Sequence, residues 1–284
     1  MMTLRQTAHP TAGASIVSTV FAVALLAAAP VHAAQIETLA KQAYMIDAQT
    51  GTVLLDKDGA VPVPPSSMSK MMTVHMVMDR IKAGRLSLKD EFLVSEKAWR
   101  MGGSKMFVEL GKKIPVADLL RGVMIQSGND ATVVLAEGIS GDEASFAELL
   151  NKEAKRMGLK DSHFVNASGW PADGHVMSAR DLANLALQTI RDYPELYKIY
   201  AEKNFTWHGI RQGNRNPLLY MNIGADGLKT GHTEAAGYGL TASAVRGGRR
   251  LILVLNGMSS MRERAQESAK LMEWGFREFN NYTL

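Results

Sequence analysis

A serine three residues ahead of a lysine is the pair in this sequence most suited to chemistry. Ser67 and Lys70 lie in the segment Pro64-Pro-Ser-Ser-Met-Ser-Lys-Met-Met-Thr73. On a helix this spacing puts both side chains on one face, so a neutral lysine amine could accept the proton of the serine hydroxyl. Ser66 is followed at the same distance by Ser69, so only Ser67 has a lysine partner. The pair predicts an activated nucleophile, although ordinary capped helices also contain such tetrads.

Two adjacent prolines indicate where this helix begins. The residue before a proline avoids helical backbone angles, and Pro65 is tolerated only at a helix start. We therefore expect the helix to begin at Ser66 or Ser67 and to end near Ala83-Gly84. Ser67 then lies in the first turn, where free backbone N–H groups and the helix dipole favour a developing oxyanion.

Two further polar segments could supply groups to the same cleft. Ser127-Gly-Asn129 separates two apolar helical stretches and could present a hydroxyl and an amide, or it could be a simple capped turn. Asp226-Gly-Leu-Lys-Thr-Gly-His-Thr233 stands at the head of a strand-rich region. On a strand, Lys229 and Gly231 share one face, and a glycine there lets the backbone of a ligand lie against the edge. A cation and a hydroxyl beside a strand edge suit an extended peptide that ends in a carboxylate.

Several kinds of chemistry are excluded or disfavoured by composition. The chain has no cysteine, which rules out thiol catalysis, thiolate-bound zinc and disulfides. The histidines beyond residue 33 lack the three- or four-residue spacing of a helical metal pair, so we expect no metal and no cofactor. His75 is interpreted as a packing residue, and the methionines around it as core. The basic segment 246–250 is interpreted as a hairpin tip and not as a nucleic-acid site.

Residues 1–33 have the pattern of a signal peptide. Arg5 is their only charged side chain, an apolar run extends over residues 16–29, and Val31-His-Ala33 provides small residues for cleavage. A membrane anchor is the alternative, but the apolar run is short for a span. We therefore expect export to the periplasm or to a cell-wall-facing compartment, with inner-membrane association left open.

Strand patterns occur at both ends of the remaining chain and helical patterns occur between them. We expect a domain over residues 34–284, with a sheet lobe from residues 34–84 and 224–284 and a mainly helical lobe from residues 85–223. Strands are predicted at 43–47, 52–56, 237–245 and 250–258, and helices at 116–125, 142–157, from 179 and from 261. The fold class is therefore α/β, with an antiparallel sheet from both ends of the chain, flanked by helices, and an inserted all-helical lobe.

The order Ser-x-x-Lys, Ser-x-Asn, Lys-Thr-Gly occurs in penicillin-binding proteins and class A β-lactamases. The chain resembles the serine D-alanyl-D-alanine carboxypeptidases, which are low-molecular-mass penicillin-binding proteins with a β-lactamase/transpeptidase-like fold. Further segments carry the likeness across most of the chain: Tyr44-Met-Ile-Asp47, His163-Phe-Val-Asn166, Ser178-Ala-Arg-Asp-Leu182, Gly209-Ile-Arg-Gln212, Asn214-Arg-Asn216 and Ala236-Gly-Tyr238.

The resemblance implies an acyl-enzyme mechanism. Ser67 would attack the carbonyl of the penultimate D-alanine and release the last one, with Lys70 as the base. The pKa of Lys70 would then be lowered by desolvation and by the charge of Lys229. Ser127 would pass the proton to the leaving nitrogen, and Asn129 would hold the amide of the acyl chain.

The resemblance also implies how the substrate is held. Lys229 and Thr230, with Gly231 beside them, would bind the terminal carboxylate. The backbone N–H groups of Ser67 and His232 would form the oxyanion hole. His232 would thus act through its main chain.

The resulting hypothesis is an exported DD-carboxypeptidase that trims peptidoglycan stem pentapeptides in cell-wall biogenesis and remodelling and is acylated by β-lactams. The alternatives are a DD-endopeptidase, a β-lactamase with Glu148 and Asn151 as its water-activating pair, and a non-catalytic penicillin sensor. The family usually has alanine and threonine where this chain has Ser66 and Ser69. Many relatives continue into a β-rich domain and a membrane-binding tail, which we expect to be absent here, either because the protein is naturally one domain or because the sequence is truncated.

Overall fold

A five-stranded antiparallel sheet is the centre of residues 36–281, which are the residues that the computed structural model describes. The predicted signal peptide, residues 1–33, lies outside the described residues. The strand order is β2-β1-β9-β8-β7, so the first hairpin pairs with the last strands, and Tyr44 lies opposite Val254. The sheet predicted from both ends of the chain is therefore confirmed. The strands are β1 (Gln42–Asp47), β2 (Val53–Lys57), β7 (Ala225–Thr233), β8 (Gly237–Arg246) and β9 (Arg249–Met258).

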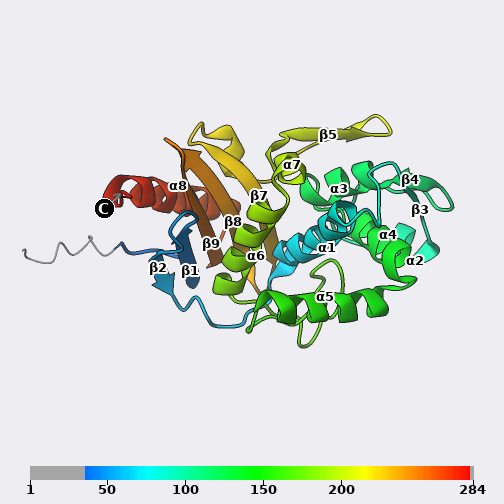
Figure 1. Cartoon of the computed structure of the whole chain (residues 1–284), viewed down its shortest axis with the longest axis horizontal. Coiled ribbons are helices and arrows are strands. Elements are labelled where there is room, and N and C mark those ends of the chain that lie inside the picture. The colour runs from blue at the N-terminus through cyan, green and yellow to red at the C-terminus, as the bar shows by residue number, and fades with distance from the viewer. Residues whose placement is uncertain (1–35, 282–284) are drawn as a thin grey trace, which may run out of the picture. The chain divides into compact units, whose positions relative to one another are not determined.

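Helices cover both faces of the sheet (Figure 1). Helix α6 (Ala179–Asp192) contacts β1 and β9 on one face, and α8 (Met261–Glu278) contacts β8 and β9 on the other. Alternate residues of β9 point to opposite faces. Ile252 and Val254 belong to the core on the α6 side, whereas Leu253 packs in the core beneath α8. The continuous apolar run of β9 follows from this double burial.

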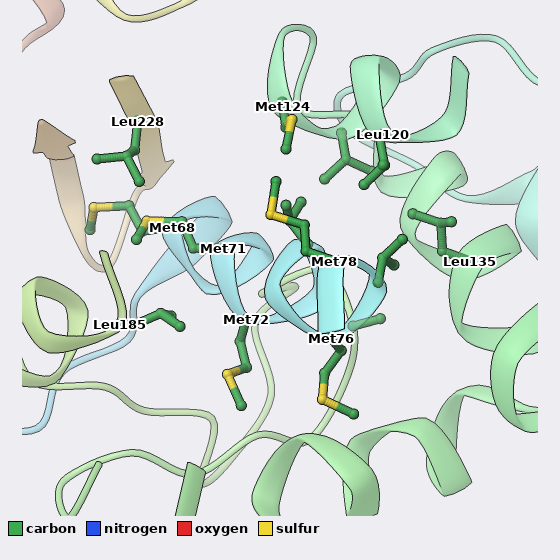
Figure 2. Packing of buried hydrophobic residues seen from close by; sticks show 14 of the residues in the cluster. Met68, Met71, Met72, Met76, Met78, Leu120, Met124, Leu135, Leu185 and Leu228 are labelled. Carbon is green, nitrogen blue, oxygen red and sulfur yellow. The ribbon is translucent and has the colours of Figure 1, made fainter. Parts of the chain in front are cut away.

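Helix α1 (Lys70–Lys82) continues directly from a short 3-10 turn, η1 (Ser66–Ser69), and lies in the middle of the larger core. Figure 2 shows the methionines of η1 and α1 among leucines of neighbouring elements. Their predicted core role is confirmed because each is at most 6% exposed, and His75 is also buried. The methionines are Met68, Met71, Met72, Met76 and Met78. The neighbouring helices are α3 (Val116–Met124), α4 (Asn129–Ser140) and α5 (Glu143–Met157).

Local caps begin the predicted helices. The side chains of Asp142, Ser178 and Ser260 each accept a hydrogen bond from the backbone N–H three residues further on. Gly158 ends α5 in the left-handed conformation, with φ of 75°. These boundaries agree with the predictions because a cap depends on only four neighbouring residues.

The inserted segment is not all-helical, which corrects one detail of the prediction. It contains two short hairpins, β3 (Glu91–Leu93) with β4 (Lys113–Pro115) and β5 (Asn204–Trp207) with β6 (Ile210–Gly213). Strands of three or four residues are too short to show an alternating pattern in the sequence. The remaining short elements are α2 (Glu96–Arg100), α7 (Pro194–Tyr197), η2 (Lys198–Ala201) and η3 (Pro217–Tyr220). Among the helices of residues 36–281, none has the length and apolar character needed to cross a membrane.

Candidate active site

The serine and lysine of the first motif meet at the junction of η1 and α1. The Lys70 Nζ lies 2.9 Å from the Ser67 Oγ and donates a hydrogen bond of 2.5 Å to the carbonyl of Ser168. Ser67 is partly exposed, whereas Lys70 is completely buried. The hydroxyl can therefore reach a ligand while the amine is shielded from water.

Burial makes Lys70 a usable base. It lowers the pKa of Lys70 to about 7, with a further contribution from the positive charge of Arg215, while Asp130 acts in the opposite direction. Desolvation was expected to have this effect, and Arg215 is a further cation that we did not expect to contribute. Lys229 is buried as well, and burial followed by the charge of Lys70 holds its pKa well below the usual range.

Ser127 and Lys229 form a second serine–lysine pair. The Lys229 Nζ lies 2.9 Å from the Ser127 Oγ and 3.0 Å from the carbonyl oxygen of Thr230. Ser127 has a φ of 64°, the left-handed region that non-glycine residues seldom adopt, in the turn before α4. Strained residues of this kind concentrate at functional sites.

Asn129 and Asp130 connect this turn to the loop of residues 101–110. The Asn129 Nδ2 donates to the carbonyl of Gly102 at 2.8 Å. The buried Asp130 carboxylate accepts hydrogen bonds from the backbone N–H groups of Met106, Phe107 and Val108 at 2.9, 2.8 and 3.2 Å. The polar turn therefore holds the loop 101–110 beside the nucleophile, a function that the sequence analysis did not assign to Asp130.

Two adjoining cavities meet at Ser67. The larger, about 420 Å³, is lined by Ser67, Ser127, Thr230, Gly231 and His232 together with Ser104, Arg215, Tyr238, Met261 and Arg264. The smaller, about 220 Å³, is lined by Asn129 and Trp170 among others, and it also reaches Ser67. Lys70 and Lys229 lie behind the surface, each held to a serine that borders a cavity. The structure thus brings all eight predicted site residues together.

Two arginines at the larger cavity were missed by the sequence analysis. Arg264, on α8, is 6% exposed, and Arg215 donates from Nη1 to the Ser104 Oγ at 2.6 Å. Both guanidinium groups stay charged at neutral pH and make this end of the site positive. Arg215 belongs to one of the segments shared with the family, but nothing in the sequence pattern distinguishes Arg264 from a surface helix residue.

Gly231 also has a packing role that the sequence did not predict. A Cβ at this position would lie 2.9 Å from the carbonyl oxygen of Pro65 and 3.2 Å from the Cβ of Ser66. The glycine therefore makes room for η1 (Ser66–Ser69), the nucleophile turn, and it also borders the larger cavity. The ring of the adjacent His232 stacks on Tyr238 with centroids 3.9 Å apart.

The glutamate considered for a β-lactamase does not border these cavities. Glu148 is exposed on α5. Asn151 has a structural role, because its amide donates to the carbonyl of Phe164 at 2.7 Å and accepts from the same residue's N–H at 2.8 Å. Neither residue is among those that line the two cavities at Ser67.

The fold and the site define a penicillin-binding protein. Two serine–lysine pairs lie at a cavity beside an antiparallel sheet into which a mainly helical segment is inserted. The chain belongs to the D-alanyl-D-alanine carboxypeptidase family of peptidases, whose model matches residues 28–260. The predicted family and fold class are confirmed.

Individual relatives agree with this assignment. D-alanyl-D-alanine carboxypeptidase DacA of Escherichia coli K12 is 42% identical over 247 residues, which cover 84% of this chain and 61% of the relative. The chain thus spans about three fifths of the length of that relative. Penicillin-binding protein 5 of Haemophilus influenzae superposes with a TM-score of 0.83 at 42% identity, covering 85% of this chain and 72% of the other. The DD-transpeptidase of Streptomyces K15 superposes with a TM-score of 0.79 at 25% identity, covering 85% of this chain and 98% of the other.

Proposed function

We propose that this protein is an exported serine DD-carboxypeptidase that removes the terminal D-alanine from peptidoglycan stem pentapeptides. One observation carries the proposal. Two serine–lysine pairs, each with a 2.9 Å contact, adjoin one cavity that Arg215 and Arg264 make positive. This arrangement combines a nucleophile, a base, a proton donor and a site for a carboxylate.

Acylation follows from the positions of these groups. The Ser67 Oγ attacks the carbonyl of the penultimate D-alanine as the neutral Lys70 amine takes its proton. The backbone N–H groups of Ser67 and His232 stabilise the oxyanion of the tetrahedral intermediate. Ser127, held by Lys229, passes this proton from the Lys70 ammonium to the leaving nitrogen, so the C–N bond breaks, D-alanine departs and Lys70 is neutral again. Water activated by Lys70 then hydrolyses the ester and restores Ser67.

The charges of the site give the substrate a direction. The terminal carboxylate is placed in the larger cavity, with Arg215, Arg264 and Thr230 as its partners. The reacting carbonyl lies at Ser67, where the two cavities meet, so the acyl part of the peptide runs into the smaller cavity past Asn129 and Trp170.

The same machinery accounts for reaction with β-lactams, whose strained amide carries a neighbouring carboxylate. Penicillin-binding protein D2 of Listeria monocytogenes, 29% identical with a TM-score of 0.78, is known in ampicillin-bound and cefotaxime-bound forms. We propose that β-lactams acylate Ser67 and block the site. Export to the periplasm remains part of the proposal and depends on the predicted signal peptide.

Release of D-alanine from diacetyl-L-Lys-D-Ala-D-Ala tests the activity. We expect release by the wild type and none by Ser67→Ala, together with a penicillin adduct that peptide mapping locates on Ser67. A wild type that is acylated but releases no D-alanine would instead be a penicillin sensor. Rapid penicillin turnover would identify a β-lactamase, and preferential cleavage of purified cross-linked muropeptides a DD-endopeptidase.

A further inference from the structure

His175 is a buried histidine to which the chemistry above assigns no role. It lies between α5 and α6 and is 3% exposed. Its Nε2 is 2.8 Å from the Oγ of Ser69, the residue immediately before Lys70. Its Nδ1 is 3.2 Å from the backbone nitrogen of Val165. Both ring nitrogens therefore have partners.

These partners determine the tautomer. A backbone N–H can only donate, so the Nδ1 that faces Val165 carries no hydrogen. The neutral ring then has its hydrogen on Nε2, and Ser69 Oγ is the acceptor. Burial, together with the nearby His163 and Lys70, lowers the pKa of His175 to about 4, so the ring is neutral at pH 7.

The hydrogen bond joins two segments that also meet at Lys70. The loop of residues 163–177 carries Ser168, whose carbonyl accepts the 2.5 Å hydrogen bond from Lys70. The next residue, Gly169, packs so closely that a Cβ would lie 1.9 Å from the carbonyl oxygen of Ser66. The hydrogen bond between His175 and Ser69 is therefore a second contact, besides that of Ser168 with Lys70, between the loop 163–177 and the segment that carries Ser67 and Lys70.

The contact with Ser168 bears on how the Lys70 amine is aimed. A neutral amine has two N–H bonds and one lone pair, and the lone pair must face the Ser67 hydroxyl to accept its proton. If one N–H donates to an acceptor that is fixed in space, rotation of the amine about its Cε–Nζ bond is restricted. The loop 163–177 supplies that acceptor, so its position limits the directions in which the lone pair can point.

We propose that His175 is a positioning residue that, through its hydrogen bond to Ser69, holds the loop 163–177 so that the Ser168 carbonyl orients the Lys70 amine toward Ser67. This inference rests on the proposed function in one respect, which is that Lys70 is the base. It adds a residue outside the three motifs to the apparatus of acylation.

Acylation by benzylpenicillin, resolved into the dissociation constant of the initial complex and the acylation rate constant, tests the proposal. We expect His175→Leu and Ser69→Ala each to lower the rate constant about tenfold and to leave the dissociation constant unchanged, because misalignment affects the reaction and not the binding. The double variant should be no slower than the slower single variant. His175→Gln places an amide N–H near the position of Nε2 and should recover most of the rate. His163→Leu, an exposed histidine of the same loop, is the matched control and should react normally.

The proposal would be overturned if the losses in acylation rate of His175→Leu and Ser69→Ala multiplied in the double variant. It would also be overturned if His175→Gln reacted as slowly as His175→Leu. Thermal melting identifies any variant that fails to fold. If His175→Leu fails to fold, Ser69→Ala still tests the hydrogen bond from the other side. Nitrogen-15 NMR of the histidine rings reads the tautomer without any activity, and a hydrogen on Nδ1 of His175 would refute the inference. Failure of the wild type to acylate at Ser67 would instead refute the proposed function.

Discussion

The pKa of Lys70 makes a quantitative prediction about the rate of acylation. A lysine with the ordinary pKa of about 10.5 would be neutral in only about 0.03% of molecules at pH 7. A pKa of about 7 leaves about half of the molecules neutral at that pH. Burial thus raises the population of the reactive form by about a thousandfold.

The sign of the pH dependence follows from the same value. In the proposed mechanism the neutral amine is the base, so we expect the acylation rate to rise as pH increases through 7 and to reach a plateau above about pH 8. At pH 5 only about 1% of Lys70 is neutral, and the rate should be about a hundredfold below the plateau.

Replacement of Arg215 moves this profile in a defined direction. The Arg215→Gln substitution removes a positive charge that disfavours the lysine ammonium, so the pKa of Lys70 rises and the midpoint moves to higher pH. Arg215 is exposed and partly screened by solvent, and burial is the larger cause. The midpoint therefore stays well below the value of a free lysine.

Stopped-flow acylation by benzylpenicillin from pH 5 to 9 provides the measurement. The midpoint of the profile, and not its height, is compared, because loss of Arg215 also weakens binding of the penicillin carboxylate. Arg211→Gln, an exposed arginine of the preceding hairpin, is the control and should leave the midpoint unchanged. A wild-type rate that is flat between pH 5 and 9, or a midpoint that moves downward in Arg215→Gln, would refute this account of Lys70.

Three further predictions concern the supports of the site. Ser127→Ala should lower the acylation rate by about a hundredfold, because the leaving nitrogen loses its proton donor; an unchanged rate with a D-alanyl peptide would contradict this role. Asp130→Ala should reduce the free energy of unfolding by about 3 kcal/mol in urea titrations, because three backbone N–H groups of the loop 101–110 lose their acceptor. A loss below about 1 kcal/mol would show that water replaces the carboxylate. Gly169→Ala should slow acylation by more than about tenfold, because its Cβ would overlap the carbonyl oxygen of Ser66. The control is Gly174→Ala, which is also at positive φ but would have no atom closer than 3.9 Å to its Cβ, and it should have a smaller effect. Equal effects on the acylation rate would mean that backbone strain, and not the overlap, is responsible.

The sequence by itself predicted the features that depend on nearby residues. The predicted starts of the helices near residues 142, 179 and 261 are confirmed, because the caps at Asp142, Ser178 and Ser260 each involve a side chain and an N–H only three residues away. The strand pattern of residues 250–258 is confirmed because burial on both faces requires apolar residues throughout. The pairing of Ser67 with Lys70 likewise follows from one turn of helix.

Tertiary structure alone decided how distant segments meet. The Ser127–Lys229 contact, the place of Arg215 and Arg264 at the cavity and the hydrogen bond between Ser69 and His175 join residues far apart in the chain. No local periodicity encodes these meetings, since they depend on the register of the sheet and on the packing of helices against it. Folding also decided what lowers the pKa of Lys70. Burial is the largest cause and the charge of Arg215 adds to it, and both burial and the distances between charges exist only once the chain has folded.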